Sequence, residues 1–194
     1  MTKPVLFLDF DYTLFDTKLL REWLGENIEE RVRAIDRGEL ELPDCSPMLY
    51  PDTLPFMRKA RQTHLLVLLT STAYPAYQKK KIIGSGVVPF LDDMLIVRVE
   101  EGYLNRARDK TSPPVSSSKG KAACEYLDRT QNAVGGTVFV DDLPENLSEV
   151  KTLLPAIRSI EIRRIERRSD NVPHTELLPP DAIVANLAEL LELL

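Results

Sequence analysis

The sequence predicts an α/β protein: a doubly wound, Rossmann-like parallel sheet with helices on both faces and a small helical insertion after the first strand. The first observation is that short apolar runs alternate with segments of helical periodicity, which is typical of strand–helix–strand units. The second is that these runs are apolar almost throughout, as expected of strands covered by helices on both faces. The third is the length of 194 residues, which favours one domain over residues 1–194.

Five apolar runs are the expected strands, and the helices are expected around them. The strands cover residues 5–8, 65–69, 94–97, 137–140 and, with the weakest pattern, 157–162. The helices cover residues 52–61, 76–83, 119–129, 144–154 and 182–194. Pro144 suits the first position of its helix, because its missing amide hydrogen would have no helical partner there. The last helix is predicted from a stripe of Ile183 and leucines at helical spacing.

Residues 17–47 depart from the alternation, because they place a helical stretch between the first two expected strands. Apolar side chains recur in it at helical spacing, at positions 20, 24, 28, 32 and 35. We expect residues 17–47 to form a small helical cap whose stripe packs on the core. Trp23 lies beside the stripe. We expect it to pack within the cap, with substrate contact at the edge of a movable lid as the alternative.

Two other segments are rich in basic residues. Residues 101–118 are rich in proline and serine and contain Arg106, Arg108 and Lys110, and we interpret them as a solvated loop. Residues 162–168 alternate isoleucine with pairs of arginine. We interpret this second run as an edge strand whose arginines discourage pairing with another chain.

Composition excludes several classes of protein. The net charge of −5 is unlike that of a dedicated duplex-DNA binder, so nucleic acid stays only as a possible substrate. Cys45 and Cys124 lack the spacing of a metal or redox motif, and the two histidines are too few for a His-rich zinc site. The longest stretch without charge, residues 62–78, contains glutamine, serine, threonine and proline, which excludes a membrane span. We expect a cytoplasmic protein without membrane contact.

The stretch of residues 5–15 carries most of the chemical information. An apolar strand leads directly into Asp9 and Asp11, and residues spaced by two point to the same side of an extended chain. In an open α/β sheet, ligands bind at the carboxyl ends of the strands. Two anions held together there repel each other unless a cation separates them. The alternative without function is a pair of aspartates in a turn, one of which caps a helix.

A second pair of carboxylates, Asp141 and Asp142, follows another predicted strand. Asp142 stands two residues before Pro144, so it is also a reasonable cap for the next helix. Neither pair would hold a metal well alone. Together they could supply the oxygen ligands of a Mg²⁺ site.

Two further features complete a set. The second strand ends in Thr70 and Ser71, which places hydroxyl groups at a carboxyl end. Lys119 opens a predicted helix, where the helix dipole disfavours a cation unless an anion faces it. Each feature alone has an ordinary explanation, a hydroxyl bonded to backbone and a solvated lysine.

The order of these four features resembles that of the haloacid dehalogenase (HAD) superfamily of phosphohydrolases. Its pattern is an apolar strand followed by DxDxT, a strand ending in Thr or Ser, a Lys, and a strand ending in an acidic pair. The resemblance covers residues 5–146, with Asp9, Asp11 and Thr13 in register in the first motif. It implies a single HAD-like domain and an enzyme, a Mg²⁺-dependent phosphatase that hydrolyses phosphomonoesters.

The resemblance also implies roles for individual residues. Asp9 would be the nucleophile that takes the phosphoryl group as an aspartyl-phosphate. Asp11 would be the acid and base, and its backbone carbonyl would bind the metal. Thr70, with Ser71 beside it, would hold the phosphate, and Lys119 would neutralise charge between the phosphate and Asp9.

In the same pattern Asp142 would be a Mg²⁺ ligand, and Asp141 either a ligand or a partner behind the ligands. Two alternatives stay open within the middle motifs: Ser71 or Thr72 in place of Thr70, and Lys121 in place of Lys119.

Other functions are compatible with parts of the pattern. A phosphotransferase or phosphomutase would carry the same motifs, and a catalytically idle binding module would retain the same fold. A dehalogenase would lack the carboxylate at Asp11. A response-regulator receiver domain places its acidic pair early in the chain, whereas here the Asp-Asp pair comes last. The class of the phosphorylated substrate and the oligomeric state are not readable from the sequence.

Overall fold

The computed structural model describes residues 3–100, 118–164 and 177–194 of the chain. Its elements along the chain are β1 (Val5–Leu8), α1 (Thr17–Leu24), α2 (Ile28–Arg37), η1 (Ser46–Met48), α3 (Thr53–Ala60), β2 (Leu65–Thr72), α4 (Pro75–Gly84), η2 (Val88–Phe90), β3 (Asp93–Arg98), α6 (Lys119–Thr130), β4 (Val138–Asp141), α7 (Pro144–Leu153), β5 (Arg158–Ile162), β6 (Ala182–Val184) and α8 (Leu187–Leu193). The predicted loop with Arg106, Arg108 and Lys110 lies outside the described residues, as do the last two arginines of the run 162–168.

The six strands form one sheet in the order β3-β2-β1-β4-β5-β6, and all described pairs are parallel. The chain leaves β1 toward β2 and β3 on one side and later fills the other side from β4 outward, so the order reverses between β1 and β4. This reversal is where doubly wound sheets bind ligands. The predicted fold class is confirmed.

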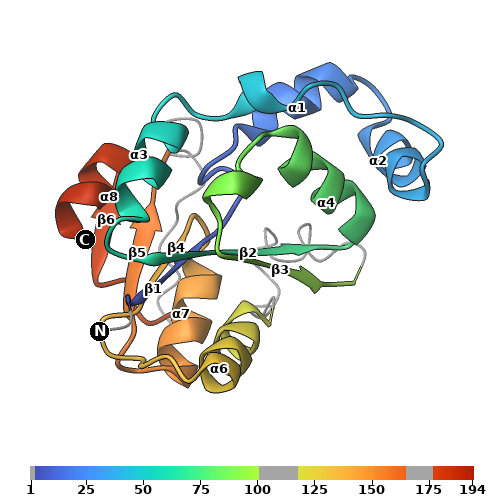
Figure 1. Cartoon of the computed structure of the whole chain (residues 1–194). Coiled ribbons are helices and arrows are strands. Elements are labelled where there is room, and N and C mark those ends of the chain that lie inside the picture. Colours follow the sequence, from blue (N-terminus) through green and yellow to red (C-terminus); the bar gives the residue numbers. More distant parts are fainter. Residues whose placement is uncertain (1–2, 101–117, 165–176) are drawn as a thin grey trace.

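Two apolar cores hold the layers together (Figure 1). Alternate residues of β1 divide between them: Leu6 and Leu8 face the core under α3, α4 and α8, whereas Val5 and Phe7 face the core over α6 and α7. In Figure 1 the helices α6 and α7 lie below the sheet and α3, α4 and α8 above it. Period-two side-chain alternation therefore explains why the strands are apolar on both faces.

The insertion of residues 17–47 contains two helices rather than one helical stretch. Asp16 caps α1 by accepting hydrogen bonds from the amides of Lys18 and Leu19. The helix ends at Gly25, whose φ of 67° suits glycine and breaks the helical run. The predicted apolar stripe is buried or half-buried across the break, with Leu20, Leu24, Val32 and Ile35 buried and Ile28 packed against them.

The insertion packs against α4, beside which it lies in Figure 1. Asp36 of α2 accepts a hydrogen bond of 2.7 Å from the amide of Tyr77, and Lys80 donates one of 2.6 Å to the carbonyl of Ile35. Trp23 is 39% exposed, and the guanidinium of Arg31 lies 5.0 Å from its ring centroid. Trp23 is thus a surface residue of the insertion rather than a core residue.

Two predictions about the C-terminal part were wrong. Residues 182–184 form strand β6, and the helix begins only at Leu187. The side chain of Asn186 accepts from the amide of Glu189, and the carboxylate of Glu189 accepts from the amide of Ala185, which starts the helix there. The run 162–168, predicted as an edge strand, is described only as far as Arg164. Ile162 ends β5, an inner strand that pairs with both β4 and β6, and residues 163–164 lie beyond the strand. Arg164, just after it, is buried and holds Asp52 through two hydrogen bonds of 2.8 and 3.0 Å.

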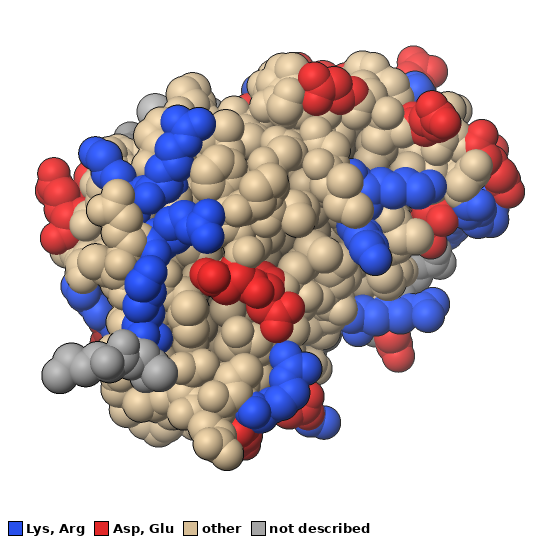
Figure 2. Space-filling view, in the orientation of Figure 1, with Lys and Arg blue, Asp and Glu red and all other residues tan. Residues whose placement is uncertain are grey.

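Among the described residues no helix combines the length and the apolar character needed to cross a membrane. Basic and acidic side chains are interspersed on the face drawn in Figure 2, and neither sign covers it.

Candidate active site

The parallel register brings three predicted site residues to one edge of the sheet. Leu8 of β1 pairs with Leu68 of β2 and with Val140 of β4. Asp9, Thr70 and Asp141 stand one or two residues beyond these partners, so their side chains meet at the carboxyl ends of neighbouring strands. The backbone amide of Asp9 donates to the carbonyl of Val140 at 3.0 Å, which fixes the nucleophile candidate against β4.

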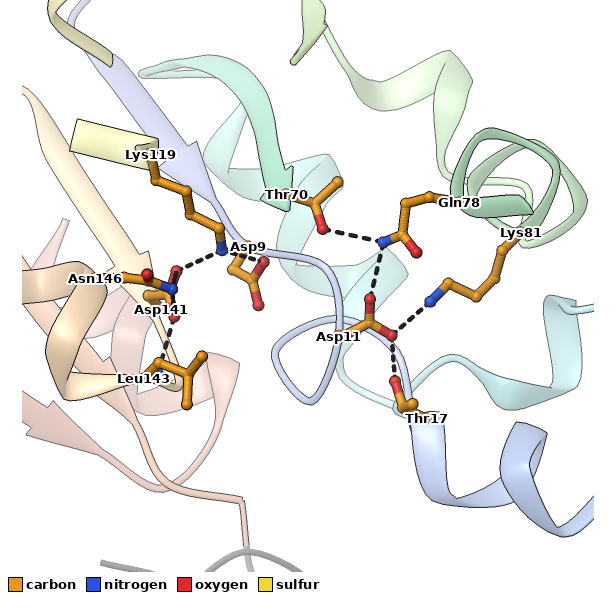
Figure 3. Close-up of polar contacts among 10 residues, drawn as sticks. All are labelled: Asp9, Asp11, Thr17, Thr70, Gln78, Lys81, Lys119, Asp141, Leu143 and Asn146. Carbon is orange, nitrogen blue, oxygen red and sulfur yellow. Dashed lines mark hydrogen bonds and ion pairs between the residues drawn. The ribbon is translucent and has the colours of Figure 1, made fainter. Parts of the chain in front are cut away.

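Lys119 joins the two acidic motifs (Figure 3). Its side chain is 2% exposed, and its Nζ lies 2.6 Å from Oδ1 of Asp9 and 2.7 Å from Oδ2 of Asp141. Lys121, the alternative left open by the sequence, points to solvent with a 73% exposed side chain and lies 3.9 Å from Glu125. Lys119 is therefore the lysine that the fold brings to the carboxylates.

Asp141 and Asp142 have different surroundings. Asp141 is fully buried, and both of its oxygens are occupied. Oδ1 accepts from the amide of Leu143 and from Asn146, and Oδ2 accepts from Asn146 and Lys119, at 2.7–3.0 Å. Asp142 instead lines the cavity above Asp9. With these contacts, Asp141 can orient Lys119, whereas Asp142 can face a ligand in the cavity.

The carboxylates of Asp9, Asp141 and Asp142 are buried, with oxygens within 4.8 Å of one another. Lys119 forms ion pairs with two of these carboxylates, Asp9 and Asp141, and buried negative charge is costly unless cations lie close to it. The donor set consists only of oxygen, which Mg²⁺ prefers. The residues present therefore fit a divalent cation, which Asp9 and Asp142 would hold.

Burial, together with the neighbouring charges of Asp141 and Asp11, raises the pKa of Asp9 to about 6 against the opposing charge of Lys119. Burial disfavours the ammonium of Lys119, but its two carboxylate partners outweigh this and raise its pKa. Lys119 thus remains charged beside the nucleophile candidate.

Asp11 lies in a separate network, turned toward α4 (Figure 3). Its Oδ1 accepts from Nζ of Lys81 at 2.6 Å and from the hydroxyl of Thr17, and its Oδ2 accepts from Nε2 of Gln78 at 2.8 Å. Burial would raise the pKa of Asp11, but the charge of Lys81 and the three donors together hold this pKa below its ordinary value. In this geometry Asp11 is an ionised carboxylate.

Gln78 connects this network to the second motif. Its Nε2 also donates to Oγ1 of Thr70 at 3.0 Å, and Thr70 is 1% exposed. Ser71 and Thr72 line the same cavity. All of the predicted site residues except Asp141 thus line one cavity, and Asp141 stands behind Lys119.

Sequence reasoning missed Lys81, Gln78 and Asn146. Lys81 and Gln78 are three residues apart and therefore share one face of α4, the face that turns toward the core. Lys81 is 2% exposed, and its Nζ lies 5.2–5.5 Å from the ring centroids of Phe10, Phe15 and Tyr77. Two polar residues on the buried face of a helix that follows a site strand are a signal that the sequence does contain.

No protein-family model matches the sequence, and a comparison with curated proteins finds no match. Solved structures do match. A protein of Burkholderia xenovorans LB400 assigned as a haloacid dehalogenase-like hydrolase aligns with a TM-score of 0.70 and 18% identity, over 99% of this chain and 96% of the other.

The HAD-hydrolase assigned as YfnB of Bacillus subtilis, solved bound to magnesium, has a TM-score of 0.64 and 13% identity, over 100% of this chain and 99% of its own. The L-2-haloacid dehalogenase of Xanthobacter autotrophicus, solved with chloropropionic acid covalently bound, has a TM-score of 0.62 and 15% identity. The match covers 100% of this chain and 98% of the dehalogenase chain. The likeness at this identity is one of fold, and it extends over the whole length of each chain. The chain therefore has the haloacid dehalogenase-like hydrolase fold that its motifs predict.

Proposed function

We propose that this protein is a Mg²⁺-dependent phosphomonoester hydrolase that acts through an aspartyl-phosphate on Asp9. The observation that carries the proposal is the position of Asp9. It is buried at the reversal of the sheet and lines a cavity together with Thr70 and Asp142, while Lys119 holds one of its oxygens. A carboxylate fixed in this way can attack phosphorus from a defined direction.

In the first step an oxygen of Asp9 forms a bond to phosphorus while the bond from phosphorus to the ester oxygen breaks, and the alcohol leaves. In the second step water attacks the same phosphorus, the bond to Asp9 breaks, and inorganic phosphate is released. Thr70 would donate to a phosphoryl oxygen, and the ammonium of Lys119 would offset the negative charge that both steps concentrate near Asp9.

Asp11 serves the second step, because an ionised carboxylate can accept the proton of the attacking water. As an acid for the first step, Asp11 would have to take up a proton, exchange its contact with Lys81 for one with the leaving oxygen, and pass the proton to that oxygen. It would regain a proton from the attacking water in the second step. A bound Mg²⁺ would supply positive charge to the phosphoryl oxygens. Asp9, Asp142 and the backbone carbonyl of Asp11 are the proposed ligands, and Asp141 is the proposed partner behind them.

Three of the similar structures are described as L-2-haloacid dehalogenases, one of them with a covalently bound chloropropionic acid. Asp11 favours phosphoryl chemistry over dehalogenation, because displacement of a halide needs no proton donor at that position. A phosphotransferase would share every residue named above. The phosphatase differs from it because water, rather than another substrate, receives the phosphoryl group from Asp9.

The test is turnover by the full chain. With Mg²⁺ present, p-nitrophenyl phosphate should release inorganic phosphate, and chelator should stop the release. Asp142→Ala should raise the Mg²⁺ concentration needed for half-maximal activity by about 10-fold or more. Asp128→Ala, at an exposed position of α6, is the matched control and should leave this requirement unchanged. Chloride release from 2-chloropropionic acid without phosphate release from any ester would overturn the proposal.

A further inference from the structure

The cavity above Asp9 extends well beyond the space that a phosphoryl group needs. Its volume is about 390 Å³, and it reaches from the ends of β1, β2 and β4 to helices α1 and α2. Cavities of this order hold small molecules rather than folded polymers. The part of the cavity away from Asp9 is therefore large enough for the organic part of a small substrate.

Aromatic and aliphatic side chains dominate that wall. Six of them come from the loop after β1, from the insertion and from the start of α4: Tyr12, Leu24, Ile28, Val32, Tyr74 and Tyr77. The aliphatic residues belong to the stripe of the insertion, so this stripe covers the core and the cavity at once. Three tyrosines around one space offer flat apolar faces with polar edges.

Tyr12 occupies a backbone conformation that does not favour its side chain. Its φ is 59°, in the left-handed region that glycine and asparagine adopt more readily than a large residue. Its amide donates to the carbonyl of Phe15 at 2.8 Å and closes the tight loop after Asp9. Asparagine or glycine would fit this backbone conformation better, but neither would place an aromatic ring in the cavity as Tyr12 does.

The charged residues of the wall do not favour a second anionic group. Lys81 is ion-paired with Asp11, and Glu29, which also lines the cavity, forms an ion pair of 2.7 Å with Arg33. Arg21 and Glu100 line the cavity with opposite charges. A polyol would also fit poorly, because hydroxyl groups against apolar side chains lose the hydrogen bonds that they make in water.

We propose that the substrate of this site is a small phosphomonoester whose organic part is aromatic, with its ring held among Tyr12, Tyr74 and Tyr77. The proposal rests on the phosphatase function proposed above. It names the substrate class of the same cavity and makes Tyr12 a specificity-determining residue.

The test compares kcat/KM for 1-naphthyl phosphate, glycerol 2-phosphate and acetyl phosphate, with Mg²⁺ and the full chain. The aromatic ester should exceed the polyol ester by at least about 10-fold. Tyr12→Asn suits the backbone and removes the ring. It should lower the ratio of naphthyl to acetyl phosphate turnover by about 10-fold, whereas Tyr12→Phe should preserve it. Glu30→Gln, exposed on α2 outside the cavity, is the matched control and should not change the ratio.

Binding of benzylphosphonate, measured by calorimetry, separates this inference from the proposed function. Turnover without an aromatic preference, or a ratio that Tyr12→Asn leaves unchanged, overturns the inference while the phosphatase function stands. Absence of all turnover refutes the phosphatase function. In that case, benzylphosphonate binding that Tyr12→Phe retains and Tyr12→Asn loses still supports the aromatic site, and absence of such binding overturns it too.

Discussion

Asp9 and Asp11 are two residues apart, and each is held by a lysine whose side chain is nearly buried, at the same distance of 2.6 Å. Their pKa values nevertheless move in opposite directions. Burial and neighbouring carboxylates raise the pKa of Asp9 to about 6. The pKa of Asp11 is lowered, because Lys81 and two further donors outweigh its burial.

The difference lies in how many carboxylates share each cation. Lys119 divides its charge between Asp9 and Asp141, whereas Asp11 has Lys81 together with Gln78 and Thr17. Asp9 therefore lies close to other carboxylates with which it shares one cation, and a metal ion would stabilise this arrangement. Asp11 has a lysine and two further hydrogen-bond donors of its own. Within one motif, the ionised form of Asp9, the proposed nucleophile, is thus poorly stabilised, whereas the ionised form of Asp11 is well stabilised.

Removal of the nucleophile is the change with the largest expected effect. Asp9→Asn should lower Mg²⁺-dependent phosphatase turnover by about 10³-fold or more, because no covalent intermediate can form. The far-ultraviolet circular dichroism spectrum should stay the same. Turnover above a few per cent of the wild-type rate in a clean preparation would mean that Asp9 is not the nucleophile.

The two lysines should differ in their effect on stability. Lys119→Met leaves Asp9 and Asp141 buried without their shared cation, and we expect the free energy of unfolding to fall by about 3–5 kcal/mol. Lys81→Met should cost less, about 1–2 kcal/mol. The reason is that Asp11 is 27% exposed and keeps Gln78 and Thr17.

Urea denaturation of both variants measures this order. Lys121→Met, whose lysine is 73% exposed, is the matched control and should stay within about 0.5 kcal/mol of the wild type. Equal losses of unfolding free energy in Lys81→Met and Lys119→Met would show that the sharing of Lys119 between Asp9 and Asp141 makes no difference to stability.

Asp11→Asn should separate substrates by their leaving groups. Alkyl phosphates need a proton on the departing oxygen and should lose about 100-fold in kcat/KM, whereas aryl phosphates should lose less than about 10-fold. Steady-state kinetics on one aryl and one alkyl ester measure the difference. The same loss on both esters would assign Asp11 to the metal site or to the fold.

The pH dependence of stability should have opposite signs at the two aspartates. The folded pKa of Asp9 is raised from 3.8 to about 6, so its contribution to stability is present below pH 3.8 and is lost as the pH rises through 6. The folded pKa of Asp11 is lowered, so its contribution is present above its ordinary value of 3.8 and is lost as the pH falls.

Asp9→Asn should therefore raise the free energy of unfolding at pH 8 by about 2 kcal/mol and have little effect at pH 4, with chelator present. Asp11→Asn should lower stability at pH 8. Urea denaturation across this pH range measures the change in the free energy of unfolding for both variants. A decrease for Asp9→Asn at pH 8 would contradict the inference that burial and neighbouring carboxylates destabilise the ionised form of Asp9.

Local sequence patterns were enough to predict the sheet class and to predict that Asp9, Thr70, Lys119, Asp141 and Asp142 lie together. Apolar runs that end in polar side chains are local patterns, and parallel strands bring their carboxyl ends to one edge. Motif order then predicted the family fold that the solved structures match. The sequence shows that Lys81 and Gln78 share one face of a helix, but it does not show that they pair with Asp11, because they reach it from 70 and 67 residues away.

Tertiary structure also decided the elements whose local pattern was ambiguous. Residues 182–184 read as the start of a helix, but pairing with β5 makes them a strand, and the same pairing removes β5 from the edge. The run of residues 162–168 was predicted to be an edge strand whose arginines discourage pairing, but Arg164 is buried against Asp52 and the carbonyl of Thr13. Short segments have weak intrinsic preferences, so their conformation and charge partners are settled by whichever neighbour the completed fold places beside them.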